Sequence, residues 1–280
     1  MKKLGEFVLF SSIFIAICAV SLCIETNLLL QLPLNTFSFY CFVFGATLVQ
    51  YNLHYLVKTT AVENSQRLAW SSKNKIIHRV LLFTGVALIL FSFLSFRLHH
   101  FIILAILATV AFLYSFPVLP FFKKKRIKDY GFLKIITLAL LWTLVTVWFP
   151  VNNFLFEKNI FVFVFFKRFV FMFMLCLLFD IRDIEIDRQE NITTLAVFLG
   201  KKKSYLLAYS FLIFFVILSF FQFLYFADKG VLIAMLLSAA ATFFTVELTK
   251  KINSDLVYLF GIDGMMLLQA ILVYLLSLKL

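Results

Sequence analysis

The stretch that decides the fold is Phe132-Leu-Lys-Ile-Ile-Thr-Leu-Ala-Leu-Leu-Trp-Thr-Leu-Val-Thr-Val-Trp-Phe149. Its apolar residues follow one another without the regular alternation of apolar and polar positions that a membrane β-strand shows. A helix needs about 20 mostly apolar residues to cross a bilayer, and this run comes close to that length. Backbone groups inside lipid must be paired within the spanning structure, which leaves only helices and closed barrels. The stretch therefore predicts a transmembrane helix.

The composition extends this prediction to the whole chain. Of the 280 residues, 63% are hydrophobic and 14% are charged, and the mean hydropathy is +1.02. Soluble domains carry about 45–50% apolar and about 25% charged residues, so a soluble globule is excluded, and so is a disordered chain. Four cysteines in apolar runs are interpreted as buried thiols rather than as a disulfide or metal set. We predict an all-α integral membrane protein.

Nine runs match the length of a transmembrane helix. They cover residues 7–24, 36–57, 80–96, 101–117, 132–149, 165–179, 205–226, 231–247 and 256–278. No linker or charged tail divides them, so we predict a single polytopic domain over residues 1–280. The first run has no small-x-small cleavage site after it and is predicted to be an anchor rather than a signal peptide.

The basic residues predict the orientation. With the N-terminus in the cytoplasm, 20 of the 26 lysines and arginines fall on the cytoplasmic side and 6 fall outside. This asymmetry predicts a cytoplasmic N-terminus and an outer C-terminus. We expect a multi-pass protein of the bacterial inner membrane. Basic loops also explain the net charge of +12, so the bilayer is an expected partner and nucleic acid is not. Lys167 and Arg168 interrupt the sixth run, and we expect them to snorkel to the outer surface if the span starts near Phe165.

Five of the fourteen acidic residues follow the sixth run, in Asp180-Ile-Arg-Asp-Ile-Glu-Ile-Asp-Arg-Gln-Glu190. If the helix continues, Asp180, Asp183 and Asp187 share one face, because they are spaced i, i+3 and i+7. Carboxylates at a helix C-terminus oppose the helix dipole, so a cation should offset their charge. Mg²⁺ typically takes one or two carboxylates plus phosphate oxygens. A solvated acidic cap is the alternative, but the hydroxyl and basic residues that follow favour a metal-bridged anion site.

These residues carry a family resemblance. Asp180 to Asp187, followed by Thr194-Leu-Ala-Val-Phe-Leu-Gly200, resembles the second aspartate-rich motif of the UbiA superfamily of intramembrane prenyltransferases. Tyr114-Ser115-x-Pro117 resembles the segment that follows the family's fourth helix. The resemblance implies a UbiA-like bundle of nine helices. It also implies transfer of an isoprenyl group from a prenyl diphosphate to a membrane-soluble acceptor, aromatic or lipidic, with Mg²⁺ bridging carboxylates and diphosphate.

The same resemblance implies roles for individual residues. Asp180, Asp183 and Asp187 are expected to bind the metal, and Asp183, Asp187 and Asn52 to carry catalysis. The expected substrate-binding residues are Tyr114, Ser115, Lys123, Lys124, Arg126, Arg182 and Thr194.

The first aspartate-rich motif of the family, Asn-Asp-x-x-Asp-x-x-x-Asp, is degenerate here. The chain keeps Asn52 but has Leu53, Leu56 and Thr60 in place of the three aspartates. On a helix, the residues that share a face with Asn52 are Tyr55, Thr59 and Glu63. If the protein is catalytic, we expect this face to take over the role of the missing aspartates. Because three carboxylates are lost, a catalytically silent homologue that binds an isoprenoid or lipid, or acts as a membrane partner, remains the second hypothesis.

Two further expectations concern the interior. Asp263 lies within the last apolar run, between Gly261 and Gly264. An ionisable group at that depth is a functional candidate, and a neutral aspartic acid bonded to a neighbouring helix is the alternative. We also expect the long loops at 58–79 and 180–204 to cover a pocket that opens to the cytoplasm.

Overall fold

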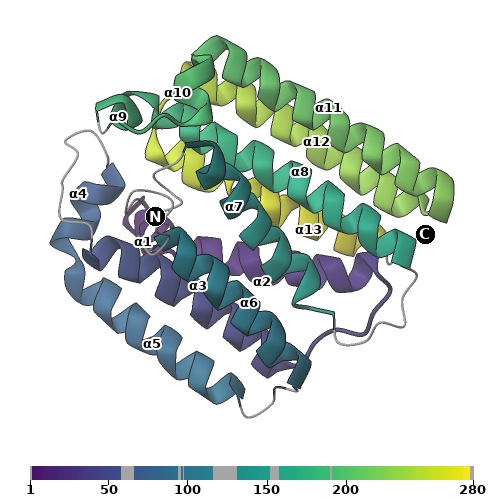
Figure 1. Ribbon diagram of the computed structural model, residues 1–280, viewed down its shortest axis with the longest axis horizontal. Coiled ribbons are helices and arrows are strands. Elements are labelled where there is room, and N and C mark those ends of the chain that lie inside the picture. The colour runs from purple at the N-terminus through teal and green to yellow at the C-terminus, as the bar shows by residue number, and fades with distance from the viewer. Residues whose placement is uncertain are drawn as a thin grey trace.

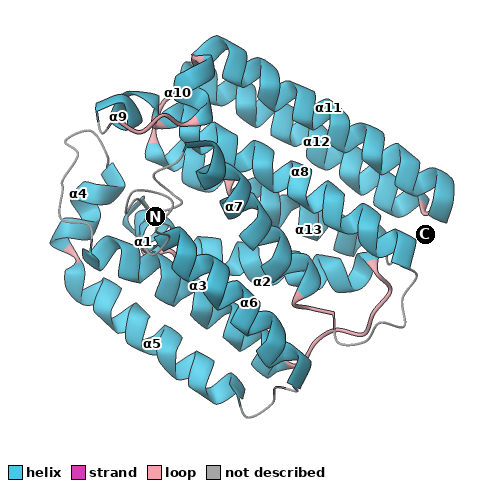
Figure 2. Cartoon of the chain, in the orientation of Figure 1, coloured by secondary structure: helices cyan, strands magenta, loops and turns pink. Residues whose placement is uncertain are grey.

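The computed structural model describes residues 2–57, 66–93, 96, 98–115, 131–151, 158–189 and 191–277. These residues form helices and loops and contain no strand (Figure 2). The helices are α1 (Lys2–Phe10), α2 (Ile13–Leu29), α3 (Phe37–Val57), α4 (Gln66–Lys73), α5 (Lys75–Phe93), α6 (Leu98–Ser115), α7 (Gly131–Thr143), η3 (Leu144–Trp148), α8 (Lys158–Arg182), α9 (Ile184–Gln189), α10 (Leu195–Leu199), α11 (Lys201–Phe226), α12 (Lys229–Lys251), η4 (Val257–Ile262) and α13 (Gly264–Ser277). The prediction of an all-α protein is confirmed.

The described residues of every predicted apolar run are mostly helical, but fewer helices meet a strict test for a membrane span. Among the described residues, six are long and apolar enough: 75–93, 131–148, 159–182, 201–226, 229–251 and 257–277. The pair α1 and α2, bent by 61°, makes a seventh if it is counted as one span. The bend falls at Ser12, whose φ of 71° lies in the left-handed region that interrupts a helix. The total of nine spans and the orientation of the termini remain predictions.

The bundle has one end that is rich in short helices. Figure 1 shows α4, α9 and α10 at that end, with the long helices running away from it side by side, and places the two termini at opposite ends. We call the end with α4, α9 and α10 the polar end. The predicted cytoplasmic loops that the structure describes fall there.

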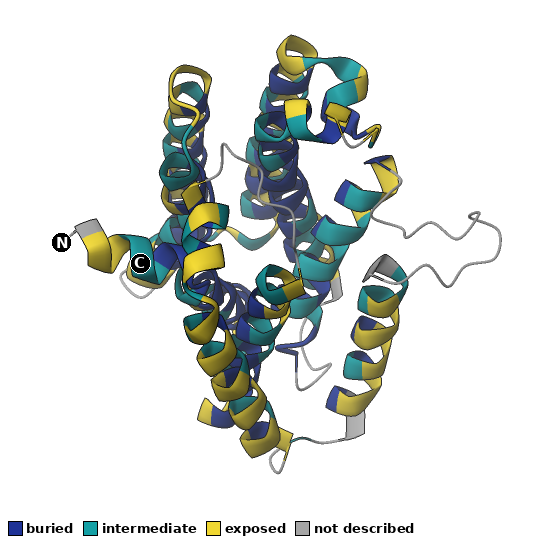
Figure 3. Cartoon of the chain, turned by 90° about the vertical axis from the view of Figure 1, so that its left-hand side faces the viewer, coloured by how far each residue is buried: buried dark blue, intermediate teal, exposed yellow. Residues whose placement is uncertain are grey.

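The core forms around α8. In its apolar window 61% of the residues are buried, against 17% for α5, which packs mainly on α3. Close approach of α3 and α5 depends on Gly45 and Gly85, because a Cβ on Gly45 would lie 2.7 Å from the Gly85 carbonyl oxygen. Figure 3 shows exposed residues on the outward helix faces and buried ones in the interior. In a bilayer those outward apolar faces meet lipid.

The prediction that Lys167 and Arg168 snorkel outward is wrong. Each side chain is only 2% exposed, because α8 begins at Lys158 and carries them about 14–15 Å inside its outer end at 1.5 Å per residue. Arg168 Nη2 lies 2.9 Å from the Glu25 carboxylate, which Gln269 Nε2 also reaches at 2.8 Å. Lys167 donates a hydrogen bond to Gln222. Buried charges are tolerated only when paired, and Glu25 supplies the pairing here.

Candidate active site

The acidic residues of the polar end divide into two groups. α8 ends at Arg182 and α9 begins at Ile184, with a single turn residue, Asp183, between them. Helical backbone hydrogen bonds continue across this turn, from Asp183 N to Phe179 O and from Asp187 N to Asp183 O. Lys134 Nζ lies 2.9 Å from Asp180 Oδ1 and 3.6 Å from Asp187 Oδ2. Asp183 turns instead to Arg182, whose Nε and Nη2 donate to its two oxygens at 2.8 and 3.0 Å. The predicted triad of carboxylates is therefore a pair around a lysine and a separate aspartate–arginine pair.

The local packing that brings Lys134 to these carboxylates involves a glycine. Gly131 begins α7 so close to the loop after α9 that a Cβ there would lie 1.7 Å from the Thr193 carbonyl oxygen. Lys134 sits on the first turn of α7, one turn from this contact. Thr194, which is fully buried, caps α10 by accepting from the Val197 N–H at 3.3 Å. Thr194 also lowers the pKa of the Asp187 carboxyl group, so its hydroxyl stabilises the ionised form of that carboxylate.

Asp180 and Asp187 are nearly buried, at 5% and 6% exposed. Among the described residues, the Oδ2 atom of each has no hydrogen-bond partner. Burial raises the pKa of Asp187 to about 6, and the nearby charges of Asp180 and Asp183 add to this rise, while Lys134 and Thr194 oppose it. Buried carboxylate oxygens that accept no hydrogen bond are costly, and the Lys134 ammonium, 3.6 Å from Asp187 Oδ2, offsets part of that cost. The two oxygens still have lone pairs to offer a metal ion.

This donor set fits Mg²⁺ only when a ligand helps to hold it. In the described part of the chain, no three carboxylate, imidazole or thiol groups gather closely enough to hold a metal ion. Mg²⁺ is commonly bound by one or two carboxylates with phosphate oxygens and water completing the octahedron. The Oδ2 atoms of Asp180 and Asp187 match the protein's share of such a site.

Arg67 and Arg182, which both contact Asp255, form a second charged group at the polar end, and we call it the basic half of the site. The Asp255 carboxylate accepts from the Arg67 backbone N–H at 2.9 Å and from Arg182 Nη1 at 3.5 Å. Arg67 Nη2 donates to Ser12 Oγ at 2.9 Å, and its guanidinium lies 4.5 Å from the centroid of the Tyr55 ring. Arg67 is 8% exposed, and its Nε has no hydrogen-bond partner among the described residues. This unpaired donor and the Arg182 group give the polar end a capacity to bind an anion.

The degenerate first motif is built around a satisfied asparagine. Asn52 is fully buried, its Nδ2 donates to the carbonyls of Ser11 and Leu48 at 3.2 and 2.8 Å, and its Oδ1 lies 2.6 Å from His78 Nδ1. Because both ends of the amide are engaged, Asn52 joins α1, α3 and α5 rather than presenting an oxygen to a metal. Tyr55 stacks on His78, with ring centroids 5.6 Å apart.

Several predicted site residues cannot be placed. Thr59, Glu63, Lys123, Lys124 and Arg126 lie outside the described residues, as do the side chains of Tyr114 and Ser115, which end α6.

The structure shows which residues surround Asp263. It is 8% exposed, its carbonyl accepts from Cys18 Sγ at 3.5 Å, and its carboxyl group interacts electrostatically with Arg67 and Arg182. The residue therefore lies beneath the basic half of the site. Both hypotheses for it stay open, but each now involves these two arginines.

Sequence reasoning missed Arg67, Asp255 and His78 as site residues. Arg67 looked like one more basic residue of a cytoplasmic loop, and Asp255 like a polar residue before an apolar run. Their contacts join positions far apart in the chain, for which one sequence carries no signal.

A helical membrane bundle that gathers carboxylates, a lysine and arginines at one end defines a class of protein suited to an anionic head group with an apolar tail. The chain belongs to the UbiA prenyltransferase family, whose sequence profile matches residues 69–261. The predicted UbiA membership is thus confirmed. No curated protein matches the chain significantly.

Solved structures agree with this fold. A UbiA homologue from Archaeoglobus fulgidus bound to GPP and Mg²⁺ has a TM-score of 0.61 and 12% identity, covering 97% of this chain and 99% of its own. A digeranylgeranylglyceryl phosphate synthase has a TM-score of 0.57 and 18% identity, with 100% of both chains covered. The Archaeoglobus homologue bound to DMAPP and Mg²⁺ has a TM-score of 0.55 and 13% identity, covering 99% and 96%. At these identities the similarity is one of fold.

Proposed function

We propose that this protein is a Mg²⁺-dependent prenyltransferase that moves an isoprenyl group from a prenyl diphosphate to a membrane-soluble acceptor. The observation that carries the proposal is the pair of buried Oδ2 atoms on Asp180 and Asp187, which accept no hydrogen bond from the described residues and lie beside Lys134. Family membership supports it, as do the Archaeoglobus homologue's complexes with GPP or DMAPP and Mg²⁺. A multi-pass position in the bacterial inner membrane belongs to the same proposal.

The residues have distinct tasks in this proposal. Asp180 and Asp187 would hold the ion, which supplies positive charge against the diphosphate. Lys134, Arg182 and Arg67 bind the diphosphate oxygens and neutralise the charge that develops on them. Asp183 orients Arg182 through its paired hydrogen bonds. Asn52 holds the neighbouring helices in place.

The reaction balances without a further reactant. The bond between the allylic carbon and the diphosphate oxygen breaks, and its electron pair stays on that oxygen. The acceptor forms a bond to the same carbon, and its proton leaves to water at the polar end. The apolar walls of the bundle keep water from the allylic carbon until the acceptor reacts.

The second candidate function is binding of a prenyl diphosphate or lipid without turnover. It is favoured by Leu53, Leu56 and Thr60 in place of aspartates and by the saturated hydrogen bonding of Asn52.

A prenyl-transfer assay distinguishes the two functions. The purified protein is incubated with labelled dimethylallyl diphosphate, Mg²⁺ and a panel of acceptors. We expect prenylated product from the wild-type protein and at least a hundredfold less from Asp187→Asn. Glu185→Gln is the matched control, because Glu185 is exposed and, among the residues that the structure describes, pairs only with Arg188. Diphosphate binding that depends on Asp187 but yields no product would establish the second function instead.

A further inference from the structure

A groove of about 320 Å³ lies between α11 and α12, within the stretches of both helices that are apolar enough to span a membrane. Its lining residues are all apolar: Leu212, Ile213, Val216 and Ile217 of α11, and Leu236, Ala239 and Ala240 of α12. Ile213 and Ile217 are 61% and 42% exposed, and Figure 1 shows the two helices side by side along one edge of the bundle. The groove therefore faces the lipid of the bilayer.

Two lysines share this face of the hairpin at the polar end, where α11 begins and α12 ends. Lys202 precedes Ile213 by eleven residues, and Lys251 follows Ala240 by eleven. Eleven residues make about three helical turns, so each lysine lies on the same helix face as its groove residue, about 16 Å away along the axis. The hydrocarbon of one leaflet is about 15 Å deep, half the thickness of the bilayer core. The lysines are therefore at the level of the head groups when the groove lies deep in the same leaflet.

A cluster of aromatic and charged side chains connects the groove with this end. Tyr209 and Phe243 lie one turn from the groove, with ring centroids 5.6 Å apart. The Tyr209 hydroxyl donates to Glu247, and Lys250 Nζ lies 2.8 Å from the same carboxylate and 4.7 Å from the centroid of the Tyr209 ring. Tyrosines are typical of the boundary between head groups and acyl chains.

Lys202 and Lys251 remain available to an anion. Both are exposed, and within the described part of the chain neither has a hydrogen bond or an ion pair. Lys251 interacts electrostatically with Glu247, but that carboxylate already pairs with Lys250. The face thus combines an apolar groove with two ammonium groups one leaflet's depth away.

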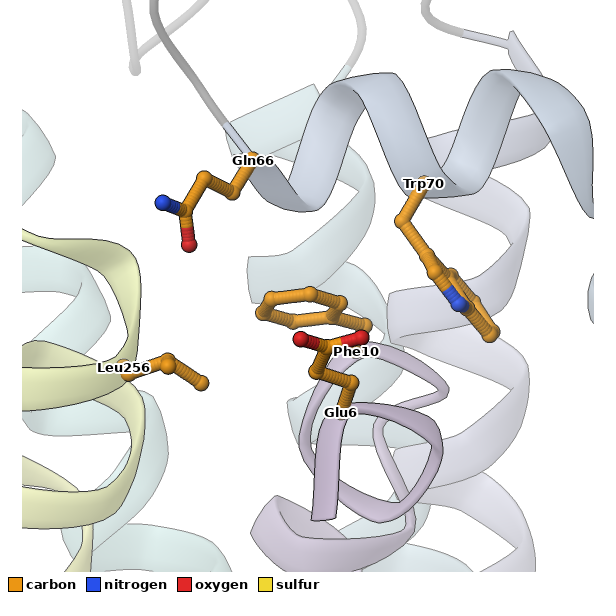
Figure 4. A pocket seen from close by; sticks show the side chains of 5 residues that line it. All are labelled: Glu6, Phe10, Gln66, Trp70 and Leu256. Atoms are coloured by element: carbon orange, nitrogen blue, oxygen red, sulfur yellow. The ribbon is translucent and has the colours of Figure 1, made fainter. Parts of the chain in front are cut away.

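The larger hollow at the polar end has a different chemistry. A cavity of about 360 Å³ lies between α1, α4 and Leu256, and Figure 4 shows the Glu6 carboxylate among its lining residues. A carboxylate in that position repels a phosphate. The residues that line the α11–α12 groove carry no charge, so an anionic amphiphile fits the hairpin rather than this cavity.

We propose that this face of the α11–α12 hairpin binds one anionic phospholipid from the leaflet at the polar end. An acyl chain lies in the groove against Ile213 and Ala240, and the phosphate accepts charge-assisted hydrogen bonds from Lys202 and Lys251. Attraction of anionic lipid contributes roughly fivefold in affinity for each lysine, and packing of the chain in the groove fixes the lipid at one place.

A second copy of the chain fits this face less well. Small residues do favour contacts between membrane helices, and two copies related by a two-fold axis would present the same face to each other. Both copies have the same orientation in the membrane, so Lys202 and Lys251 of one copy would meet those of the other at one level. Like charges repel there, whereas a lipid phosphate neutralises them.

Native mass spectrometry of the delipidated protein in uncharged detergent tests the charge contribution. The protein is titrated with dioleoyl phosphatidylglycerol and dioleoyl phosphatidylcholine, and we expect the anionic lipid to bind at least tenfold more tightly. In the double variant Lys202→Gln/Lys251→Gln the difference should fall below about threefold. The control is Lys73→Gln/Lys75→Gln, which removes two exposed lysines where α4 ends and α5 begins and should leave the difference unchanged.

A groove-filling variant tests the place of the acyl chain. Ala240 is exposed, so Ala240→Phe should fold normally and weaken binding of dioleoyl phosphatidylglycerol at least tenfold. Binding of dihexanoyl phosphatidylglycerol should not change, because its short chains do not reach the groove. Ala108→Phe, at an exposed alanine of α6, is the control and should bind both lipids as the wild type does.

Three results overturn the inference. The first is equal binding of the two dioleoyl lipids, and the second is a preference that both lysine double variants reduce alike. The third is a wild-type dimer that Ala240→Phe separates into monomers, because the groove would then be an interface between copies. Lipid binding is measured without prenyl diphosphate, so its outcome and that of the proposed function are independent.

Discussion

Lys134 Nζ lies 2.9 Å from Asp180 Oδ1, so a protein ammonium group sits beside the carboxylate pair that is proposed to hold the metal ion. The same nitrogen is 3.6 Å from Asp187 Oδ2. An ammonium can balance two carboxylates before substrate arrives and then turn to the diphosphate when a metal ion takes over that balance. We therefore expect Lys134 to exchange its carboxylate partners for the diphosphate when substrate and metal bind.

Replacing Lys134 with methionine should weaken pyrophosphate binding more without Mg²⁺ than with it. Without the ion, Lys134 is the cation nearest the carboxylates, and a charge-assisted hydrogen bond to an anion contributes about 1.5–3 kcal/mol. We expect a loss of roughly tenfold or more in pyrophosphate affinity without Mg²⁺ and a smaller loss at saturating Mg²⁺, measured by calorimetry. Lys201→Met is the control, since Lys201 is an exposed lysine at the start of α11. An equal loss under both conditions would contradict the exchange of roles.

Binding of Mg²⁺ with pyrophosphate should strengthen as the pH rises through about 6. The pKa of Asp187 is raised to about 6, mainly by burial, so below that pH the carboxyl group carries a proton that a metal ion must displace. The folded-state pKa exceeds that of an unfolded aspartate, so the ligand-free protein should lose stability as the pH rises from about 4 to 6. Pyrophosphate also titrates, so the comparison is with Asp187→Asn. A wild-type pH profile that matches this variant would show that Asp187 is not the titrating ligand.

The buried pair between Glu25 and Arg168 predicts a large stability effect far from the site. Removing one partner of a buried ion pair typically costs about 3–5 kcal/mol, because the other charge is left unpaired in the interior. Arg168→Met and Glu25→Gln should each lower the free energy of unfolding by about 3–5 kcal/mol, measured by denaturant unfolding. The double variant should lose less than the sum of the two.

The control for that pair is Arg188→Met. Arg188 and Glu185 are 50% and 79% exposed and form a surface pair, for which the expected cost is about 0–1 kcal/mol. Similar unfolding midpoints for Arg168→Met and Arg188→Met would contradict the buried assignment.

The sequence allowed the helical membrane class and the grouping of Asp180 with Asp187 to be predicted, for local reasons. Continuous apolar runs determine where helices form, and residues seven apart lie on one helix face. Asp183 pairs instead with its chain neighbour Arg182, a choice of partner that the spacing of the three aspartates does not reveal.

What could not be predicted depends on contacts between distant segments. Asn52 is joined to His78 across 26 positions, and Arg67 to Asp255 across 188. Glu25 lies just past the end of an apolar run, where a carboxylate usually marks a solvated helix end. Only the packing of α2 against the rest of the bundle shows that it neutralises Arg168.

The role of Asn52 can be decided by measuring stability and metal affinity in one variant. Asn52→Ala removes two hydrogen bonds to carbonyls and the contact with His78, and buried groups left without partners cost about 1–3 kcal/mol each. We therefore expect a lower unfolding midpoint and reduced prenyl transfer, with the apparent Mg²⁺ affinity in saturating pyrophosphate changed by less than about threefold. Asn74→Ala is the matched control, because Asn74 donates one side-chain hydrogen bond, to the Trp70 carbonyl. If Asn52→Ala instead keeps its stability and loses tenfold or more in Mg²⁺ affinity, the asparagine is a metal ligand, and its side chain must leave His78 when substrate binds.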